Sequence, residues 1–294
     1  MLTITRLMGQ FFFSGRVLPT HRLKHSPVGG PFQSTMREAI RLLSDAPLPH
    51  PGVFATNDTR SIPSASIPDT DPFSSAALTY TTTGTDTWPS PSSYLSNRHS
   101  WVHVFPEGRV HQHPHKTMRY FRWGVARLIL EADECPDIVP MWIEGYNQVF
   151  PEDREFLRPL PRIGKRLEIW LGRNVAGVSR PDNGEPGLKS DADHVFHSLR
   201  LRWKSLVYRE TMAKGLPLPE LGTLPESLQH GNEALELRME CTRAVRDAVL
   251  QLRKQRGLPD EDPKAGLVDT WREEGSGVEG SGEKKNDGSL VGDT

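Results

Sequence analysis

The stretch Trp101-Val-His-Val-Phe-Pro-Glu-Gly-Arg109 decides how this chain is interpreted. The apolar run at residues 101–105 predicts a strand, and Pro106 must end it because proline has no backbone N–H to donate to a sheet. Gly108 permits a tight turn. We therefore expect Glu107 at the end of a strand, where open α/β sheets bind their ligands.

Two kinds of site fit the residues around this turn. Arg109 has a rigid guanidinium fork that suits a phosphate or a carboxylate. Histidines at positions 103, 111, 113 and 115 raise a metal cluster as the alternative, since imidazole is a common zinc ligand. The run His111-Gln-His-Pro-His115 lacks the ligand spacing of a known zinc motif, so the sequence favours a phosphate site without a metal.

Composition divides the 294 residues into parts that can fold and parts that cannot. Residues 47–98 are rich in Pro, Ser, Thr and Asp, and residues 258–294 carry ten acidic side chains against four Lys or Arg. Such segments bury too little apolar surface to offset their ordering entropy, so we expect a disordered insertion and a disordered acidic tail. The foldable parts are then 1–46, 99–176 and 177–257.

The foldable parts alternate between strand and helix patterns. Apolar residues recur every three or four positions in four segments, which predicts helices at 34–44, 117–132, 191–213 and 233–256. Short apolar runs predict strands at 11–18, 101–105, 138–143 and 167–171. This order indicates an α/β fold, in which helices pack on a sheet, followed by a C-terminal helical region at 177–257.

The distribution of charge favours a lipid surface as a partner. Residues 1–44 hold six Lys or Arg against one acidic side chain, which suits anionic phospholipid headgroups. No nucleic-acid-binding motif accompanies this charge, so we expect no nucleic-acid partner. No apolar run is long enough for a transmembrane helix, and attachment to a membrane surface stays open.

Several blocks in the same order resemble the glycerolipid acyltransferases and, among them, the tafazzins. Phe105–Gly108 matches their Phe-Pro-Glu-Gly block, and Gly15–Arg22 resembles an upstream segment that ends in a substrate-binding arginine. Ile138–Trp142 resembles their apolar strand with an internal proline, while Met118–Gly124 and Gly29–Gln33 resemble the tafazzins in particular. The resemblance implies the sheet of that superfamily and acyl transfer between phospholipids and lysophospholipids, as in cardiolipin remodelling. It implies no acyl-CoA, metal or other cofactor.

The substrate-binding residues that we expect are Arg22, Glu107, Gly108 and Arg109. The two arginines suit the phosphate of a lysophospholipid, and Glu107 would hold an arginine or the glycerol hydroxyls. The resemblance implies phospholipid and lysophospholipid as substrates and peripheral attachment to a mitochondrial membrane, facing the intermembrane space. Nothing in the sequence indicates an oligomeric state.

The catalytic dyad of the family, His-x4-Asp, does not occur in this sequence. None of the eleven histidines is followed five positions later by Asp, and family order would place the dyad before Gly15, where no histidine occurs. We therefore expect no catalytic base here. An N-terminally truncated form of a longer enzyme is favoured, because the binding motifs survive, over a non-catalytic relative that still binds lipid surfaces. A metal-binding protein built on the histidines is the least favoured alternative.

Overall fold

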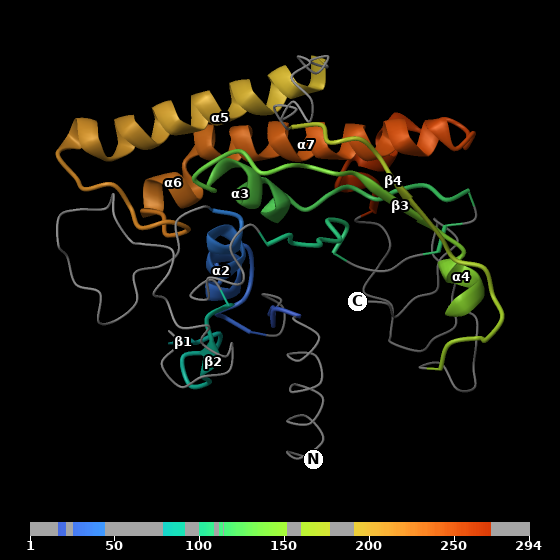
Figure 1. Cartoon of the computed structure of the whole chain (residues 1–294). Helices are drawn as coiled ribbons and strands as arrows, with labels where there is room; N and C mark the ends of the chain where they lie inside the picture. The colour runs from blue at the N-terminus through green and yellow to red at the C-terminus, as the bar shows by residue number, and fades with distance from the viewer. Residues whose placement is uncertain are drawn as a thin grey trace, which may run out of the picture. The chain divides into compact units, whose positions relative to one another are not determined.

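The computed structural model describes residues 17–21, 26–44, 79–91, 100–108, 112–113, 115–151, 160–176 and 191–271. These residues form helices and small antiparallel sheets (Figure 1). They belong to two compact units. Unit 1 takes its residues from 1–103, 127–136 and 200–236, and unit 2 takes its residues from 104–126, 137–199 and 237–294.

Three helices pass from one unit to the other, namely α3 (Gly124–Leu130), α5 (Asp191–Glu210) and α7 (Asn232–Gln255). The remaining elements of unit 1 are α2 (Ser34–Leu42), β1 (Thr79–Tyr80), β2 (Trp88–Pro89), η3 (Met212–Lys214) and α6 (Glu226–His230). Those of unit 2 are β3 (Met141–Glu144), α4 (Tyr146–Val149), β4 (Glu168–Leu171), η4 (Pro263–Gly266) and η5 (Asp269–Trp271).

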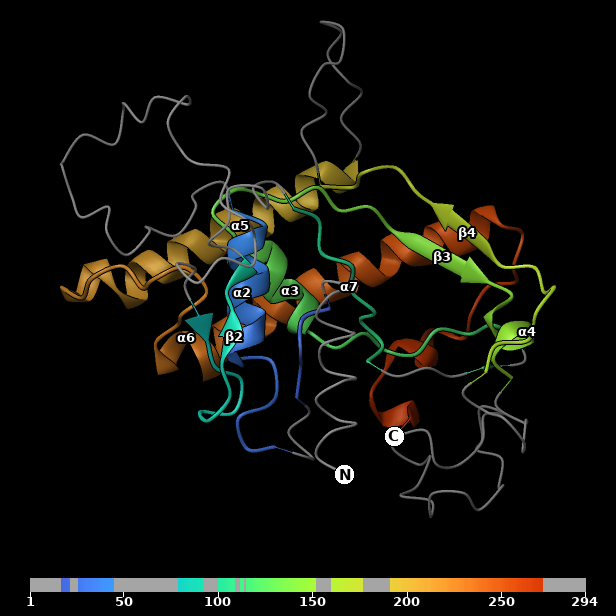
Figure 2. The same ribbon diagram turned by 60° about the horizontal axis from the view of Figure 1, so that its bottom comes forward.

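The core of unit 1 lies between α2 and the second half of α3, which are side by side in Figures 1 and 2. Ile40 is fully buried against Leu128, and burial of such a side chain contributes about 1.5–3 kcal/mol. The fully buried Glu38 forms an ion pair with Arg41 at 2.9 Å and accepts a hydrogen bond from the Ser90 hydroxyl. The expected helix at 34–44 is thus confirmed as α2, which ends two residues earlier.

Residues 79–91 have regular structure inside the segment expected to be a disordered insertion. Strands β1 and β2 pair antiparallel, and the Asp86 carboxylate fixes their turn. It accepts hydrogen bonds from the Thr82 and Thr83 backbone N–H groups at 2.8 Å each, and from the Trp88 indole at 2.6 Å. Composition alone misses this turn, because one carboxylate satisfies several donors locally. The other residues of 47–98 lie outside the described residues.

Strands β3 and β4 form an antiparallel hairpin in unit 2, with Met141 opposite Leu171 and Trp142 opposite Trp170 (Figure 2). The expected strand at 167–171 is confirmed, and the one at 138–143 is confirmed in part, since β3 begins at Met141. The described residues therefore combine helices with two-stranded sheets. The larger sheet of a glycerolipid acyltransferase is not among them.

Of the two expected elements around the Phe-Pro-Glu-Gly block, the strand at 101–105 is wrong, and the helix at 117–132 is confirmed only in part. Residues 101–105 are not a strand, and the Trp101 and Phe105 side chains are 81% and 67% exposed. Residues 117–123 are not helical, so α3 begins only at Gly124. Their backbone groups bind side chains from other parts of the chain instead of forming helical hydrogen bonds, as described below for Met118 and Arg119.

The two long C-terminal helices are confirmed. α5 covers most of the expected helix at 191–213, and α7 covers 233–256 to within one residue. The α7 stripe includes the buried Leu237, Val245 and Leu252. No helix in the described part of the chain is long and apolar enough to span a bilayer.

Residues 258–271 also differ from the expected disordered tail. They contain η4 and η5, and the Trp271 side chain is buried, with its indole N–H donating to the Ala265 carbonyl at 2.7 Å. Charge counting cannot detect such a segment, because a single buried aromatic side chain and a paired carboxylate suffice to fix it. The remainder of the expected tail lies outside the described residues.

Candidate functional site

The Phe-Pro-Glu-Gly block forms the expected turn in unit 2. The Gly108 N–H donates to the Phe105 carbonyl at 3.0 Å, and Gly108 has a φ of +70°. This left-handed conformation favours glycine. A Cβ atom at position 108 would also lie too close to Nε of Arg122. The close approach of this arginine is therefore possible only because residue 108 has no side chain.

The Glu107 carboxylate is fixed by the segment that precedes α3. Its Oε2 accepts a hydrogen bond from the Arg119 backbone N–H at 3.0 Å. Burial raises the pKa of Glu107 from its ordinary value of 4.5 to about 7, against the lowering effects of that hydrogen bond and of the positive charges of Arg119 and Arg246. A carboxyl group with this pKa can bind a hydroxyl either as donor or as acceptor near neutral pH.

Arg122 is the cationic side chain that packs directly on the block. Its backbone N–H donates to the Pro106 carbonyl at 2.7 Å, and its side chain is exposed and lies against Gly108. The exposed Arg122 guanidinium provides donors for a phosphate, and the carboxyl group of Glu107, the residue before Gly108, is a partner for hydroxyls. This pair has the chemistry needed to bind a glycerophosphate headgroup.

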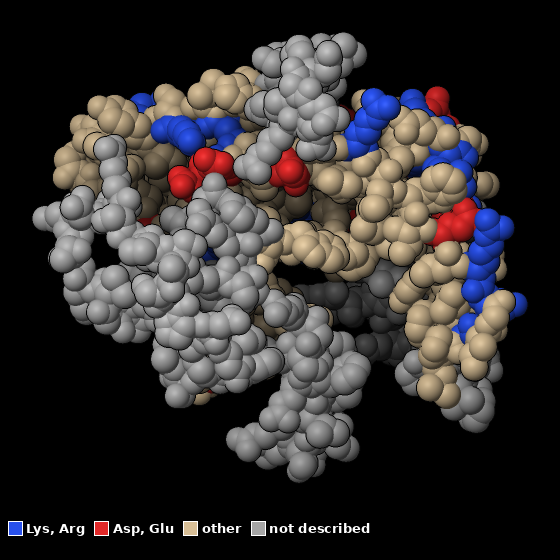
Figure 3. All heavy atoms as spheres, viewed as in Figure 1, with Lys and Arg blue, Asp and Glu red and all other residues tan. Residues whose placement is uncertain are grey.

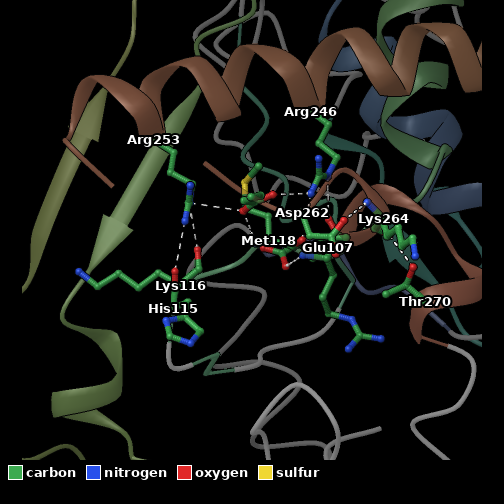
Figure 4. A network of polar contacts seen from close by, with 12 residues as sticks. Glu107, His115, Lys116, Met118, Arg246, Arg253, Asp262, Lys264 and Thr270 are labelled. Carbon is green, nitrogen blue, oxygen red and sulfur yellow. Dashed lines mark hydrogen bonds and ion pairs between the residues drawn. The ribbon is translucent and has the colours of Figure 1, made fainter. Parts of the chain in front are cut away.

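Residues 115–119 form hydrogen bonds with side chains of α7 and of the segment after it (Figure 4). Arg246 donates from Nε to the Arg119 carbonyl and from Nη2 to the Met118 carbonyl, both at 3.0 Å. Arg253 donates to the Lys116 and His115 carbonyls, each at 3.2 Å. Of these residues, Met118 and Arg119 fall in the expected helix at 117–132, but neither is helical in the structure.

The expected site residues are only partly within the described residues. Glu107 and Gly108 lie at the expected turn, but Glu107 does not lie at the end of a strand as expected, because residues 101–105 are not a strand. Arg22 and Arg109 lie outside the described residues, so their distances from Glu107 stay predictions. Arg122 was not among the expected site residues, although it lies in the block Met118–Gly124 that resembles the tafazzins.

The histidines do not form a metal site in the part of the chain that the structure covers. There, no three His, Cys, Asp or Glu side chains are grouped to hold a metal ion. The His113 and His115 rings lie 5.7 Å apart between centroids, and His111 is outside the described residues.

The chain is similar to several known proteins. It is 30% identical to tafazzin from Saccharomyces cerevisiae over 275 residues, which cover 91% of this chain and 60% of that protein. It is 43% identical to Drosophila melanogaster tafazzin over 73 residues, covering 25% of this chain and 18% of that protein. It is 35% identical to N-acylphosphatidylethanolamine synthase from Arabidopsis thaliana over 148 residues, covering 47% and 49%.

No protein-family model matches the chain. The chain spans less than two thirds of the length of each of these relatives. The match to the yeast protein nevertheless extends over nearly the whole of this chain and agrees with the blocks noted in its sequence. The chain is therefore a homologue of the tafazzins.

Proposed function

We propose that this chain carries the substrate-binding part of a phospholipid acyltransferase of the tafazzin type. Its substrates would be a phospholipid, which gives the acyl group, and a lysophospholipid, which accepts it. The relatives support this class of substrate, because one is named as a synthase of an acylated phosphatidylethanolamine and others are named tafazzins.

The observation that carries the proposal is the turn at Gly108, the residue directly after Glu107, against which the exposed Arg122 side chain packs. The exposed Arg122 side chain lies against Gly108, and the Glu107 carboxyl group, one residue earlier, accepts a hydrogen bond from the Arg119 N–H. A lysophospholipid presents a phosphate and a free glycerol hydroxyl within a few bonds of each other. We assign the phosphate to Arg122, together with Arg22 and Arg109 as expected from the sequence, and the hydroxyl to Glu107.

The acyl transfer step needs a base to remove the proton of the acceptor hydroxyl. The family supplies it as His-x4-Asp, which this sequence lacks. We therefore expect these 294 residues to bind lysophospholipid without transferring acyl chains. Transfer without acyl-CoA, a role in cardiolipin remodelling and a place on the mitochondrial membrane facing the intermembrane space belong to the proposal as features of the tafazzin type.

The turn between α4 and β4 supports peripheral contact with a membrane. Ile163 is 96% exposed beside Gly164, and the exposed Arg162, Lys165 and Arg166 flank it. Lys and Arg side chains gather over the β3–β4 part of unit 2, at the right of Figure 3. Each basic residue near an anionic leaflet contributes about 1 kcal/mol, and an exposed apolar tip can enter the interface.

The test is a binding titration of the 294-residue protein with a short-chain lysophosphatidylcholine below its micellar concentration. We expect saturable binding of the lysophospholipid. The Glu107→Gln substitution should weaken this binding, and added glycerol should not displace the bound lysophospholipid. Incubation with a labelled donor phospholipid should give no acylated product. Absence of saturable binding would overturn the assigned site, and product formation would overturn the assignment of the chain as a binding part without a base.

A further inference from the structure

Residues 258–271 contact the segment that binds Glu107, although no site was expected in them. Glu261 is 3% exposed, and its carboxylate accepts a hydrogen bond from the Met118 backbone N–H at 2.6 Å. The same carboxylate pairs with Arg246 of α7 at 2.7 Å. Figure 4 shows Arg246 pointing from α7 toward Met118 and Glu107.

Arg246 links Glu261 to Arg119, because it binds both residues. Its guanidinium, held by Glu261, donates to the two carbonyls of Met118 and Arg119. The planar fork of arginine fixes the plane of both peptide groups at once. Because Arg246 is 11% exposed, its charge depends on Glu261 for a partner more than an exposed arginine would.

Trp271 contacts the side chain of Arg119, whereas Arg246 binds its backbone carbonyl. The Arg119 guanidinium carbon lies 4.4 Å from the centroid of the indole ring, and both side chains are buried. This is the geometry of a cation–π contact, which strengthens when water is excluded. Arg119 is thus fixed through its carbonyl by Arg246 and through its side chain by Trp271, while its N–H binds Glu107.

We infer that residues 258–271 are a positioning segment for the headgroup site, in which Glu261 and Trp271 act through Arg246 and Arg119 to fix the Glu107 carboxyl group. The inference rests on the proposed function for its substrate, a lysophospholipid. Glu261 and Trp271 are positioning residues, since they act on Glu107 through Met118, Arg246 and Arg119. The charged groups that act on Glu107 are Arg119, Arg246 and Glu261.

The test uses three variants of the full chain, Trp271→Ala, Trp271→Phe and Glu261→Gln. The matched control is Trp170→Ala, which removes a second stacked pair in the same unit, where the Arg256 guanidinium lies 3.5 Å from the Trp170 ring centroid. The titration of Glu107 is followed by infrared difference spectroscopy of each protein against the same protein carrying Glu107→Gln. Binding of short-chain lysophosphatidylcholine is measured in parallel.

We expect Trp271→Ala and Glu261→Gln to move the titration of Glu107 away from that of the parent and to weaken lysophosphatidylcholine binding by about tenfold. Trp271→Phe should restore most of both, because phenylalanine keeps an aromatic face, and Trp170→Ala should leave both unchanged. Parent-like titration in Trp271→Ala and Glu261→Gln would overturn the inference. So would equal effects from Trp170→Ala, because they would show a general loss of packing.

The two readouts separate the inference from the proposed function. If the parent protein does not bind lysophosphatidylcholine, the proposed function fails, while the titration of Glu107 still reports whether residues 258–271 position it. If the parent binds and the variants bind equally well with an unchanged titration, the inference alone fails.

Discussion

The Glu107 carboxylate accepts a hydrogen bond from the backbone N–H of Arg119 at 3.0 Å. Arg119 lies twelve positions later, in a segment whose apolar spacing predicts a helix. In the expected helix at 117–132, that N–H would lie in the first turn, where backbone donors have no acceptor within the helix. In the structure, the Glu107 carboxyl group at the turn satisfies this donor in the non-helical segment before α3.

Replacing Glu107 by glutamine should remove a pH dependence of stability. Burial raises the pKa of Glu107 from 4.5 to about 7, so its contribution is fully present below the ordinary pKa and is lost as the pH rises through 7. The free energy of unfolding should fall by at most about 3 kcal/mol over this interval in the parent. Urea unfolding on both sides of the interval measures it. A fall of the same size in Glu107→Gln would contradict the assignment.

Gly108→Ala should cost stability and displace Arg122. An alanine at a φ of +70° is strained by about 1 kcal/mol, and its Cβ would collide with the arginine side chain. Gly84→Ala is the matched control, because Gly84 has a φ of +87° and open space around its Cα. Thermal unfolding should report similar losses for both variants, whereas only Gly108→Ala should weaken lysophosphatidylcholine binding. Equal lysophosphatidylcholine binding by the two variants would show that Arg122 is not part of the headgroup site.

Arg122→Ala should weaken binding of lysophosphatidylcholine by about tenfold, since a charge-assisted hydrogen bond to a phosphate contributes about 1.5–3 kcal/mol. Arg122→Lys should retain part of the affinity, because the charge remains while the fork is lost. Calorimetric titration measures both, with the exposed Arg173→Ala as a control for general charge. Unchanged affinity in Arg122→Ala would remove this residue from the headgroup site.

Ile163→Asp should reduce binding to vesicles that contain anionic phospholipid. The substitution places a negative charge at an apolar tip that is 96% exposed and surrounded by basic side chains. Co-sedimentation with anionic and with neutral vesicles measures the effect, and added salt should weaken binding of the parent. Leu201→Asp changes a side chain that is 56% exposed on α5 and should bind like the parent. Vesicle binding by Ile163→Asp at the parent level would exclude this turn as the contact.

The sequence was sufficient for those elements whose own residues determine them. α2, α5 and α7 have apolar stripes of helical period, and β4 is a short apolar run, so each was predicted close to its observed bounds. The turn at Gly108 was predicted for the same reason, because proline and glycine restrict or permit backbone angles locally.

The scaffold of the site was not predictable in this way. From the sequence alone, Arg246 belongs to a helix surface and Glu261 to an acidic tail. In the structure, Arg246 donates to the carbonyls of Met118 and Arg119, and Glu261 accepts from the Met118 N–H, more than a hundred residues away. Only the folded chain brings these groups together, and their hydrogen bonds override the local preference of residues 117–123 for a helix. Spacing within a segment carries no information about such partners.

The hydrogen bond from the Ser90 hydroxyl to the buried Glu38 carboxylate has a consequence for shortening the protein. The segment rich in Pro, Ser and Thr would be the first choice for deletion by anyone seeking a minimal version for crystals. Removing residues 79–91 would take away a donor from a fully buried anion in the middle of α2. A shortened version should therefore keep residues 79–91.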